Sequence, residues 1–162
     1  MGNLTEIYSV MDLAIHEARR TMRGNIGGPF GAAIVNKESG SVIAVASNTV
    51  LGDHDPTAHA EVNAIREACK KLGTHDLTGH ELYATGYPCP MCLSACIWAN
   101  IDTVYYGCTP SDADSIGFRD DFIYDFIKDG CKDENVLKLS PKERDNCLSL
   151  FHEYTEANKT IY

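Results

Sequence analysis

The stretch Tyr87-Pro88-Cys89-Pro90-Met91-Cys92 places two cysteines three positions apart. Pro90 favours the first position of a helix, because the N–H that proline lacks would have no partner there. Two sulfurs at this spacing in a first helical turn point the same way, and the helix dipole stabilises thiolates there. The stretch therefore predicts one half of a metal clamp, although redox dithiols share the same spacing.

A third ligand is predicted in His59-Ala60-Glu61. Apolar residues recur at steps of three and four from residue 58 to residue 72, which predicts a helix that begins immediately before His59. Thr57 is the expected N-cap of that helix. If the two helices lie side by side, their N-termini can share one ion.

His59, Cys89 and Cys92 are ligands of the types that zinc prefers. A catalytic zinc has three protein ligands and keeps its fourth position for water, so we expect one Zn²⁺ per subunit with water or hydroxide as the fourth ligand. Cys96 could close the site into a structural one, but it lies about 6 Å further along the helix axis and is expected to point into the helix body.

Glu61 is the candidate catalytic residue. Its position two residues after His59 turns it away from the ligand by roughly 200°, so it is not expected to bind the metal. A carboxylate beside the activated water can take its proton and return it to a substrate nitrogen or leaving group. The alternative is an exposed glutamate that stabilises a helix start.

Composition describes an ordinary globular chain of 162 residues, with 44% hydrophobic and 23% charged residues, which predicts a single domain. A net charge of −9 counts against a nucleic-acid partner, since phosphate contacts require a basic face. We expect no signal peptide, membrane span or membrane partner. Seven cysteines, an odd number, are more typical of free thiols in a reducing compartment, and a cytoplasmic location is predicted.

Hydrophobic periodicity predicts an α/β protein in which helices cover a central sheet. The apolar helix at residues 91–99 is expected to be buried. The predicted helices are residues 4–22, 58–72, 89–99, 116–127 and 141–158, and the predicted strands are residues 30–35, 42–47, 81–85, 103–107 and, weakly, 136–139.

The combination of His59-Ala60-Glu61 with Pro88-Cys89-Pro90-Met91-Cys92 resembles the zinc-dependent cytidine deaminase superfamily. The wider pattern Gly27-Gly28-Pro29-Phe30-Gly31-Ala32, Asp55-Pro56-Thr57-Ala58-His59-Ala60-Glu61 and Gly117-Phe118-x-Asp120 looks like the guanine deaminases of bacteria. The resemblance implies a three-layer fold with a mostly mixed five-stranded sheet in one domain, residues 1–162. It also implies hydrolytic deamination of a purine, guanine giving xanthine and ammonia by attack at C2.

The same resemblance implies further site residues. Asn48 would hydrogen-bond the purine, Asp120 would accept hydrogen bonds from the guanine amino group or ring N–H, and Phe30 would pack against the ring. Ala60 would also contact the substrate. Tyr162 would close the pocket of a partner subunit after exchange of C-terminal segments (about residues 141–162), which implies a swapped homodimer.

Without the resemblance, these positions have ordinary explanations. Asn48 suits a turn at a strand end, Phe30 a core position, Asp120 an acidic surface run and Tyr162 a frayed terminus. The chain also departs from the family in one place, because Tyr87 stands where a glutamate is common; the zinc ligands are unaffected, but substrate preference can change.

Other functions remain open at this point. An adenosine deaminase acting on tRNA shares the zinc motifs but needs a basic surface for phosphate, against the acidic balance of this chain. A deaminase of guanosine or cytosine is a second alternative, since the shape of the pocket sets the choice of substrate. Outside the enzymes, the alternative is an interaction module stabilised by an inert zinc.

Overall fold

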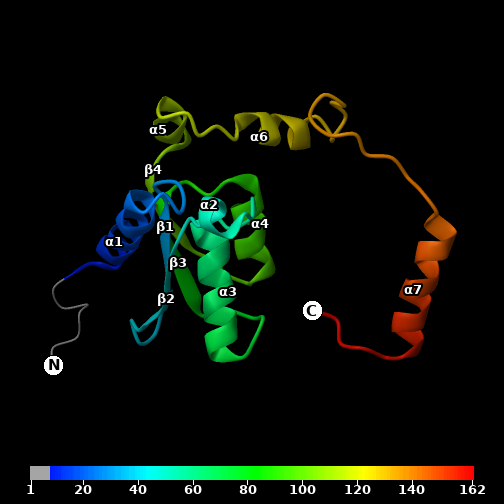
Figure 1. The fold of residues 1–162 in the computed structure, drawn as a ribbon. Helices are drawn as coiled ribbons and strands as arrows, with labels where there is room; N and C mark the ends of the chain where they lie inside the picture. Colours follow the sequence, from blue (N-terminus) through cyan, green and yellow to red (C-terminus); the bar gives the residue numbers. More distant parts are fainter. Residues whose placement is uncertain (1–7) are drawn as a thin grey trace. The chain divides into compact units, whose positions relative to one another are not determined.

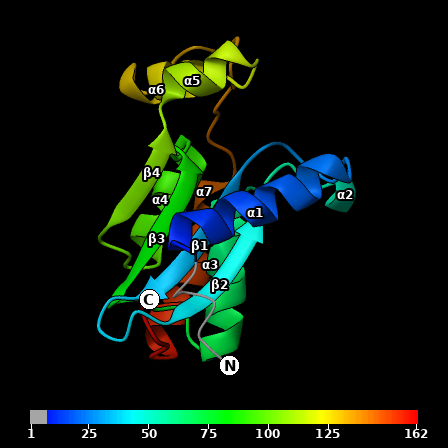
Figure 2. The ribbon, with the colours of Figure 1, turned by 90° about the vertical axis from the view of Figure 1, so that its left-hand side faces the viewer.

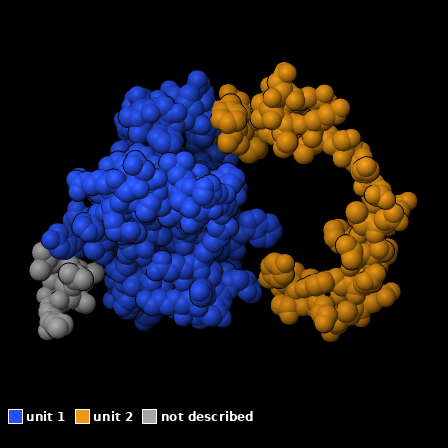
Figure 3. All heavy atoms as spheres, viewed as in Figure 1, with its two compact units in different colours: residues 1–121 blue, residues 122–162 orange. Residues whose placement is uncertain are grey.

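The computed structural model describes residues 8–162 and separates into two compact units, residues 1–121 and residues 122–162 (Figure 3). Leu4 and Ile7, which begin the first predicted helix, lie outside the described residues. Within the described range, no helix is both long and apolar enough to cross a membrane.

The first unit is built on a mixed sheet with the strand order β2-β1-β3-β4. β1 runs antiparallel to β2 and β3, whereas β3 and β4 are parallel. The predicted hairpin is confirmed by the pairing of β1 with β2. The bounds of the strands are β1 Gly31–Asn36, β2 Val42–Ser47, β3 His80–Gly86 and β4 Val104–Cys108.

The described residues contain four strands, so the prediction of a fifth strand is wrong. The short apolar run at residues 136–139 forms no ladder. Instead, the N–H groups of Val136 and Leu137 both donate to the carbonyl of Asp133, which closes a turn. A short apolar run becomes a strand only where it finds a pairing partner, and this one remains exposed.

Helices cover both faces of the sheet. α1 (Val10–Arg23) lies on one face, and α3 (Ala60–Leu72) and α4 (Pro90–Trp98) lie on the other (Figures 1 and 2). Two short helices, α2 (Val50–Asp53) and α5 (Pro110–Ser115), complete the unit. The predicted three-layer α/β fold is confirmed.

Small residues allow the layers to approach closely. Ala14 and Ala18 are the buried apolar residues of α1, and a Cβ atom on Gly31 of β1 would lie 2.0 Å from the carbonyl oxygen of Ala14. Only glycine therefore permits this contact. On the other face, Ala60, Ala64 and other buried alanines of α3 pack against β1 and β2.

The expectation that the apolar helix is buried all round is wrong. In α4, Cys92 and Cys96 face the core, but Ile97 is 67% exposed and Trp98 is 76% exposed. Its composition predicts that other parts of the protein pack against every side of the helix. Within the first unit, its neighbours cover only one side of it.

The remaining helices are α6 (Asp121–Lys128) and α7 (Arg144–Glu156). The helix predicted for residues 116–127 is wrong in its first part, because Gly117 adopts a φ of +96°, which interrupts a right-handed helix. α5 was not predicted. Among residues 122–162, Phe126 is the one described hydrophobic side chain that is buried.

Candidate active site

Two helix starts build the centre of the site. His59 is the N-cap of α3, and Cys89 is the N-cap of α4 with Pro90 directly after it. α3 therefore begins one residue after His59 rather than before it. The Cys89 sulfur accepts a hydrogen bond from the backbone N–H of Cys92, at 3.5 Å, which fixes both sulfurs at the first turn of α4.

The geometry of the three predicted ligands fits a tetrahedral zinc ion. Their ligand atoms lie within 4.8 Å of one another. The Nδ1 atom of His59 is 3.6 Å from the Cys89 sulfur and 3.5 Å from the Cys92 sulfur. Bonds of about 2.3 Å to sulfur and 2.05 Å to nitrogen at a tetrahedral angle separate these atoms by about 3.6 Å. The residues thus fit zinc without rearrangement.

The charge state of these ligands also suits a cation. The hydrogen bond from Cys92 lowers the pKa of the Cys89 thiol to about 4, and that same shared proton raises the pKa of Cys92. The hydrogen bond with Cys89 raises the pKa of His59, although burial opposes this. The lowered pKa of Cys89 favours its thiolate, which is the form that binds a metal. Cys96 belongs to the hydrophobic core and not to the ligand group.

Glu61 lies in the first turn of α3 and is only 6% exposed. Burial raises the pKa of its carboxyl, while a hydrogen bond with Cys92 works in the opposite direction. A buried carboxyl with a raised pKa can both accept and return a proton, as general acid–base catalysis requires.

One cavity of about 530 Å³ joins these groups to most of the other candidates. Its lining includes His59, Glu61, Phe30, Asn48 and Asp120. Burial raises the pKa of the Asp120 carboxyl, with a smaller contribution from the nearby Cys89 thiolate. These residues come from four separate parts of the sequence, since His59 and Glu61 share one helix start, and the fold brings them to one place.

The other candidates lie elsewhere. Ala60 is fully buried at the start of α3, between two residues that line the cavity. Tyr162 is in the second unit and is 84% exposed.

The orientation of the Asn48 side chain is fixed by the backbone. Its Oδ1 accepts hydrogen bonds from the N–H groups of Gly28, at 3.3 Å, and Val50, at 3.1 Å. A Cβ atom on Gly27 would lie 1.9 Å from the Asn48 carbonyl oxygen, so glycine is required beside it. With its oxygen engaged in this way, Asn48 offers N–H donors to a ligand.

Two aromatic side chains that were not among the candidate site residues also line the cavity. The ring of Phe118 packs edge-on against that of Phe30, with centroids 5.1 Å apart, and Tyr87 contributes to the wall. Arg119 lies at the same cavity and pairs with Asp114, at 3.2 Å. Sequence spacing did not reveal that Phe118 lines the cavity, because periodicity placed it with Phe122 in the helix predicted for residues 116–127. In the structure Phe118 lies in a loop.

Residues 4–108 match the family described as the cytidine and deoxycytidylate deaminase zinc-binding region. This chain belongs to that family. The resemblance inferred from the two motifs is thereby confirmed, as is the prediction that the protein is a deaminase of the zinc-dependent type.

Individual relatives in this deaminase family cover different lengths of the chain. The guanine deaminase of Bacillus subtilis is 45% identical over 150 residues, which are 92% of this chain and 94% of that protein. A crystal structure of guanine deaminase from the same organism superposes with a TM-score of 0.85 at 40% identity, covering 100% of this chain and 99% of the other. The tRNA-specific adenosine deaminase of Aquifex aeolicus is 43% identical over 97 residues, 59% of this chain and 62% of its own length.

Proposed function

We propose that this protein is a guanine deaminase that converts guanine to xanthine and ammonia. One observation carries the choice of base: the same cavity is lined by Asn48, which offers N–H donors, and by Asp120, whose carboxyl group accepts hydrogen bonds. Guanine presents the acceptors O6 and N7 along one edge. Its N1–H and 2-amino donors lie on another edge and suit a carboxylate.

The adenine edge fits less well. Adenine carries an amino donor where guanine carries a carbonyl oxygen, and the Asn48 oxygen that could accept from it is engaged by Gly28 and Val50. The length of the guanine deaminase match supports the same choice, because it covers 92% of this chain and so extends beyond the shared zinc-binding region, whereas the tRNA deaminase match covers 59% of it.

The ring is held between aromatic surfaces and polar groups. Phe30, supported edge-on by Phe118, provides a flat surface for the purine, and Asn48 and Asp120 fix its rotation. His59, Cys89 and Cys92 would hold a zinc ion, which when bound would supply a water activated for attack near neutral pH. Positioning and water activation together lower the barrier to displacement of the amino group.

Glu61 moves the protons. Its carboxylate takes a proton from the attacking water and delivers it to the purine ring nitrogen beside the attacked carbon. It then takes the proton of the newly added hydroxyl group and gives it to the amino group, which leaves as ammonia while the C2 carbonyl forms. Burial of Glu61 raises the pKa of its carboxyl, which favours the protonated form needed for the second half of each transfer.

The test is the release of ammonia from guanine, guanosine, adenine, cytosine and an anticodon stem-loop of tRNA, with the product identified by chromatography. We expect turnover of guanine with formation of xanthine. Turnover of the RNA without turnover of guanine would overturn the assignment. Turnover of guanosine in preference to guanine would move the substrate from the free base to the nucleoside.

We further propose that two copies form a homodimer that exchanges C-terminal segments, so that Tyr162 closes the pocket of the partner. Exposed apolar side chains support this proposal. In the first unit they include Ile97 and Trp98 of α4, and in the second unit Phe151 and Tyr162. A segment of 41 residues that buries so little of its own apolar surface gains stability by packing against another surface.

Subunit complementation tests the exchange. One variant lacks Tyr162, and the other carries Cys89→Ser and has no functional zinc site. After mixing and verified exchange of subunits, a mixed dimer contains one intact pocket, so part of the activity should return. Absence of any recovery would contradict the exchanged arrangement, while a monomer in sedimentation equilibrium would contradict the dimer itself.

A further inference from the structure

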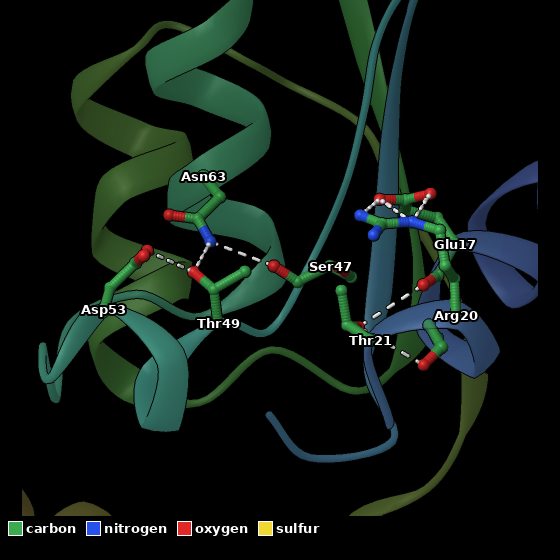
Figure 4. Close-up of polar contacts among 8 residues, drawn as sticks. Glu17, Arg20, Thr21, Ser47, Thr49, Asp53 and Asn63 are labelled. Carbon is green, nitrogen blue, oxygen red and sulfur yellow. Dashed lines mark hydrogen bonds and ion pairs between the residues drawn. The ribbon is translucent and has the colours of Figure 1, made fainter. Parts of the chain in front are cut away.

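Asn63 lies on α3, one turn after His59, and its side chain joins the start of α3 to the end of β2 (Figure 4). Its Nδ2 donates to the backbone carbonyl of Ser47, at 2.9 Å, and to the hydroxyl of Thr49, at 2.9 Å. A longer contact of 3.3 Å reaches the carbonyl of Ala58. The side chain of Asn63 thus holds the residues on both sides of Asn48.

The connection continues beyond Asn63. The Thr49 hydroxyl donates to the carboxylate of Asp53 in α2, at 2.6 Å. The same hydroxyl accepts from Asn63 in α3, so Thr49 links the two helices. The backbone N–H of Thr49 also donates to the carbonyl of Ala58, at 3.0 Å. The end of β2 is therefore tied to the start of α3 through side chains and backbone together.

This arrangement connects two functions on different elements. The start of α3 carries His59 and Glu61, the ligand and the proton carrier, whereas Asn48 at the end of β2 orients the base. The Oδ1 of Asn48 accepts from the N–H groups of Gly28 and Val50, and not from these two residues. The distance between base recognition and proton transfer is instead set through Asn63.

We propose that Asn63 is a positioning residue that sets Asn48 relative to His59 and Glu61, and so aligns the purine for attack. The inference rests on the proposed guanine deaminase function. Asn63 does not line the cavity, so it acts through Asn48 rather than on the substrate. A misplacement of about 1 Å can cost on the order of a hundredfold in rate, which is why a half-buried amide outside the cavity can matter.

Asn63→Asp keeps the shape of the side chain but replaces both donors with acceptors that face a carbonyl and a hydroxyl. We expect the KM for guanine to rise about tenfold, the effect of one lost hydrogen bond, with zinc content unchanged. Thr49→Val, which removes only one support, should raise KM by a smaller factor. This second variant also preserves the test if Asn63→Asp does not fold.

Thr21→Val is a matched control. Thr21 is 1% exposed, and its hydroxyl donates to the carbonyls of Glu17 and Ala18, both at 3.3 Å, within α1 (Figure 4). The substitution Thr21→Val therefore removes a hydrogen bond from a buried side chain to backbone carbonyls, at a position outside the site. We expect lower thermal stability with an unchanged KM. An equal rise of KM in this control would reduce Asn63 to a general structural role and overturn the proposal.

A double-mutant cycle separates positioning from other effects. Binding of radiolabelled guanine is measured by equilibrium dialysis in the Glu61→Gln background, where turnover is blocked. Asn63→Asp should weaken binding about tenfold when Asn48 is present, but less than twofold when Asn48 is replaced by alanine. Losses that add independently would contradict the proposal.

The side-chain amide of Asn48 gives a measurement that needs no substrate. In ¹⁵N–¹H spectra, Asn63→Asp should shift the Asn48 amide pair and the backbone N–H of Gly28, whereas Thr21→Val should leave both in place. Unchanged resonances would overturn the positioning role. A wild-type protein that does not deaminate guanine, while these shifts occur, would instead contradict the proposed function and leave the positioning of Asn48 supported.

Discussion

The rings of Tyr87 and Tyr106 pack edge to face, with centroids 4.8 Å apart and planes at 76°. Tyr87 lines the cavity, at the position where the sequence resemblance led us to expect a glutamate. Tyr106 lies on β4 and does not line the cavity, so it contacts Tyr87 from outside the cavity. The neutral wall of the pocket therefore depends on a second tyrosine.

Replacement of Tyr106 tests this support. An edge-to-face pair contributes about 0.5–1.5 kcal/mol beyond burial, so Tyr106→Ala should raise the KM for guanine about two- to tenfold. Tyr105→Ala is the control, because Tyr105 points to the opposite face of the sheet and pairs with Tyr83 at 4.9 Å. Steady-state kinetics should show a change in KM for the first variant alone; equal changes would place the effect in the strand rather than in the wall.

Removal of zinc should abolish activity and lower the melting temperature. In the proposed site three ligands from two helix starts would hold the ion, so its loss would leave two cysteine sulfurs and an imidazole without their partner. A chelator such as 1,10-phenanthroline, followed by addition of Zn²⁺, should remove and restore activity. Elemental analysis should find about one zinc per chain in the wild type and in the exposed control Cys147→Ser, but none in Cys92→Ser.

Glu61→Gln should leave zinc content and folding intact while kcat falls about 10²- to 10⁴-fold, the usual contribution of a general acid–base residue. The amide keeps the shape of the side chain but cannot carry a proton. Glu67→Gln, an exposed change on the same helix, should retain wild-type turnover. Full activity in Glu61→Gln would exclude Glu61 as the proton carrier.

Asp76 should contribute to the stability of the first unit in a pH-dependent way. Hydrogen bonds from the hydroxyl and N–H of Thr78, and then from Asn100, hold the pKa of Asp76 below its ordinary value of 3.8. A lowered pKa in the folded state stabilises the protein above the ordinary value, and this stabilisation is lost as pH falls through the folded value.

Thermal melts as a function of pH measure this contribution. Asp76→Asn should melt at a lower temperature than the wild type at neutral pH, and the two melting temperatures should converge below about pH 4. Thr78→Val should show the same convergence, because it removes one of the donors from the same carboxylate. A constant difference across the whole range would show that the charge of Asp76 is not involved.

The parts of the fold that sequence predicts well are those fixed by local chemistry. The hairpin of β1 and β2 follows from two β-rich runs around a polar connection, and the start of α4 follows from Pro90 after Cys89. The candidate ligands could be named in advance for a related reason: few residue types bind zinc, and their spacing at helix starts restricts the choice further.

The parts that sequence missed depend on what lies opposite a segment. Residues 136–139 are apolar enough for a strand but have no partner strand among the described residues, and Trp98 belongs to an apolar helix whose outer side is uncovered. The role of Asn63 was also hidden, because an amide that binds backbone carbonyls has no characteristic spacing in the sequence. Such contacts become visible only when the chain is folded.

Trp98 is the single tryptophan of the chain, and its side chain is 76% exposed on α4. Unfolding of one subunit would therefore change the surroundings of this indole only slightly. Association of two subunits through α4 would instead remove it from water and shift its fluorescence emission to shorter wavelength. In the proposed dimer this indole would act as a natural optical reporter that responds to assembly more strongly than to folding, and a dilution series monitored by emission wavelength would measure the dissociation constant without any label.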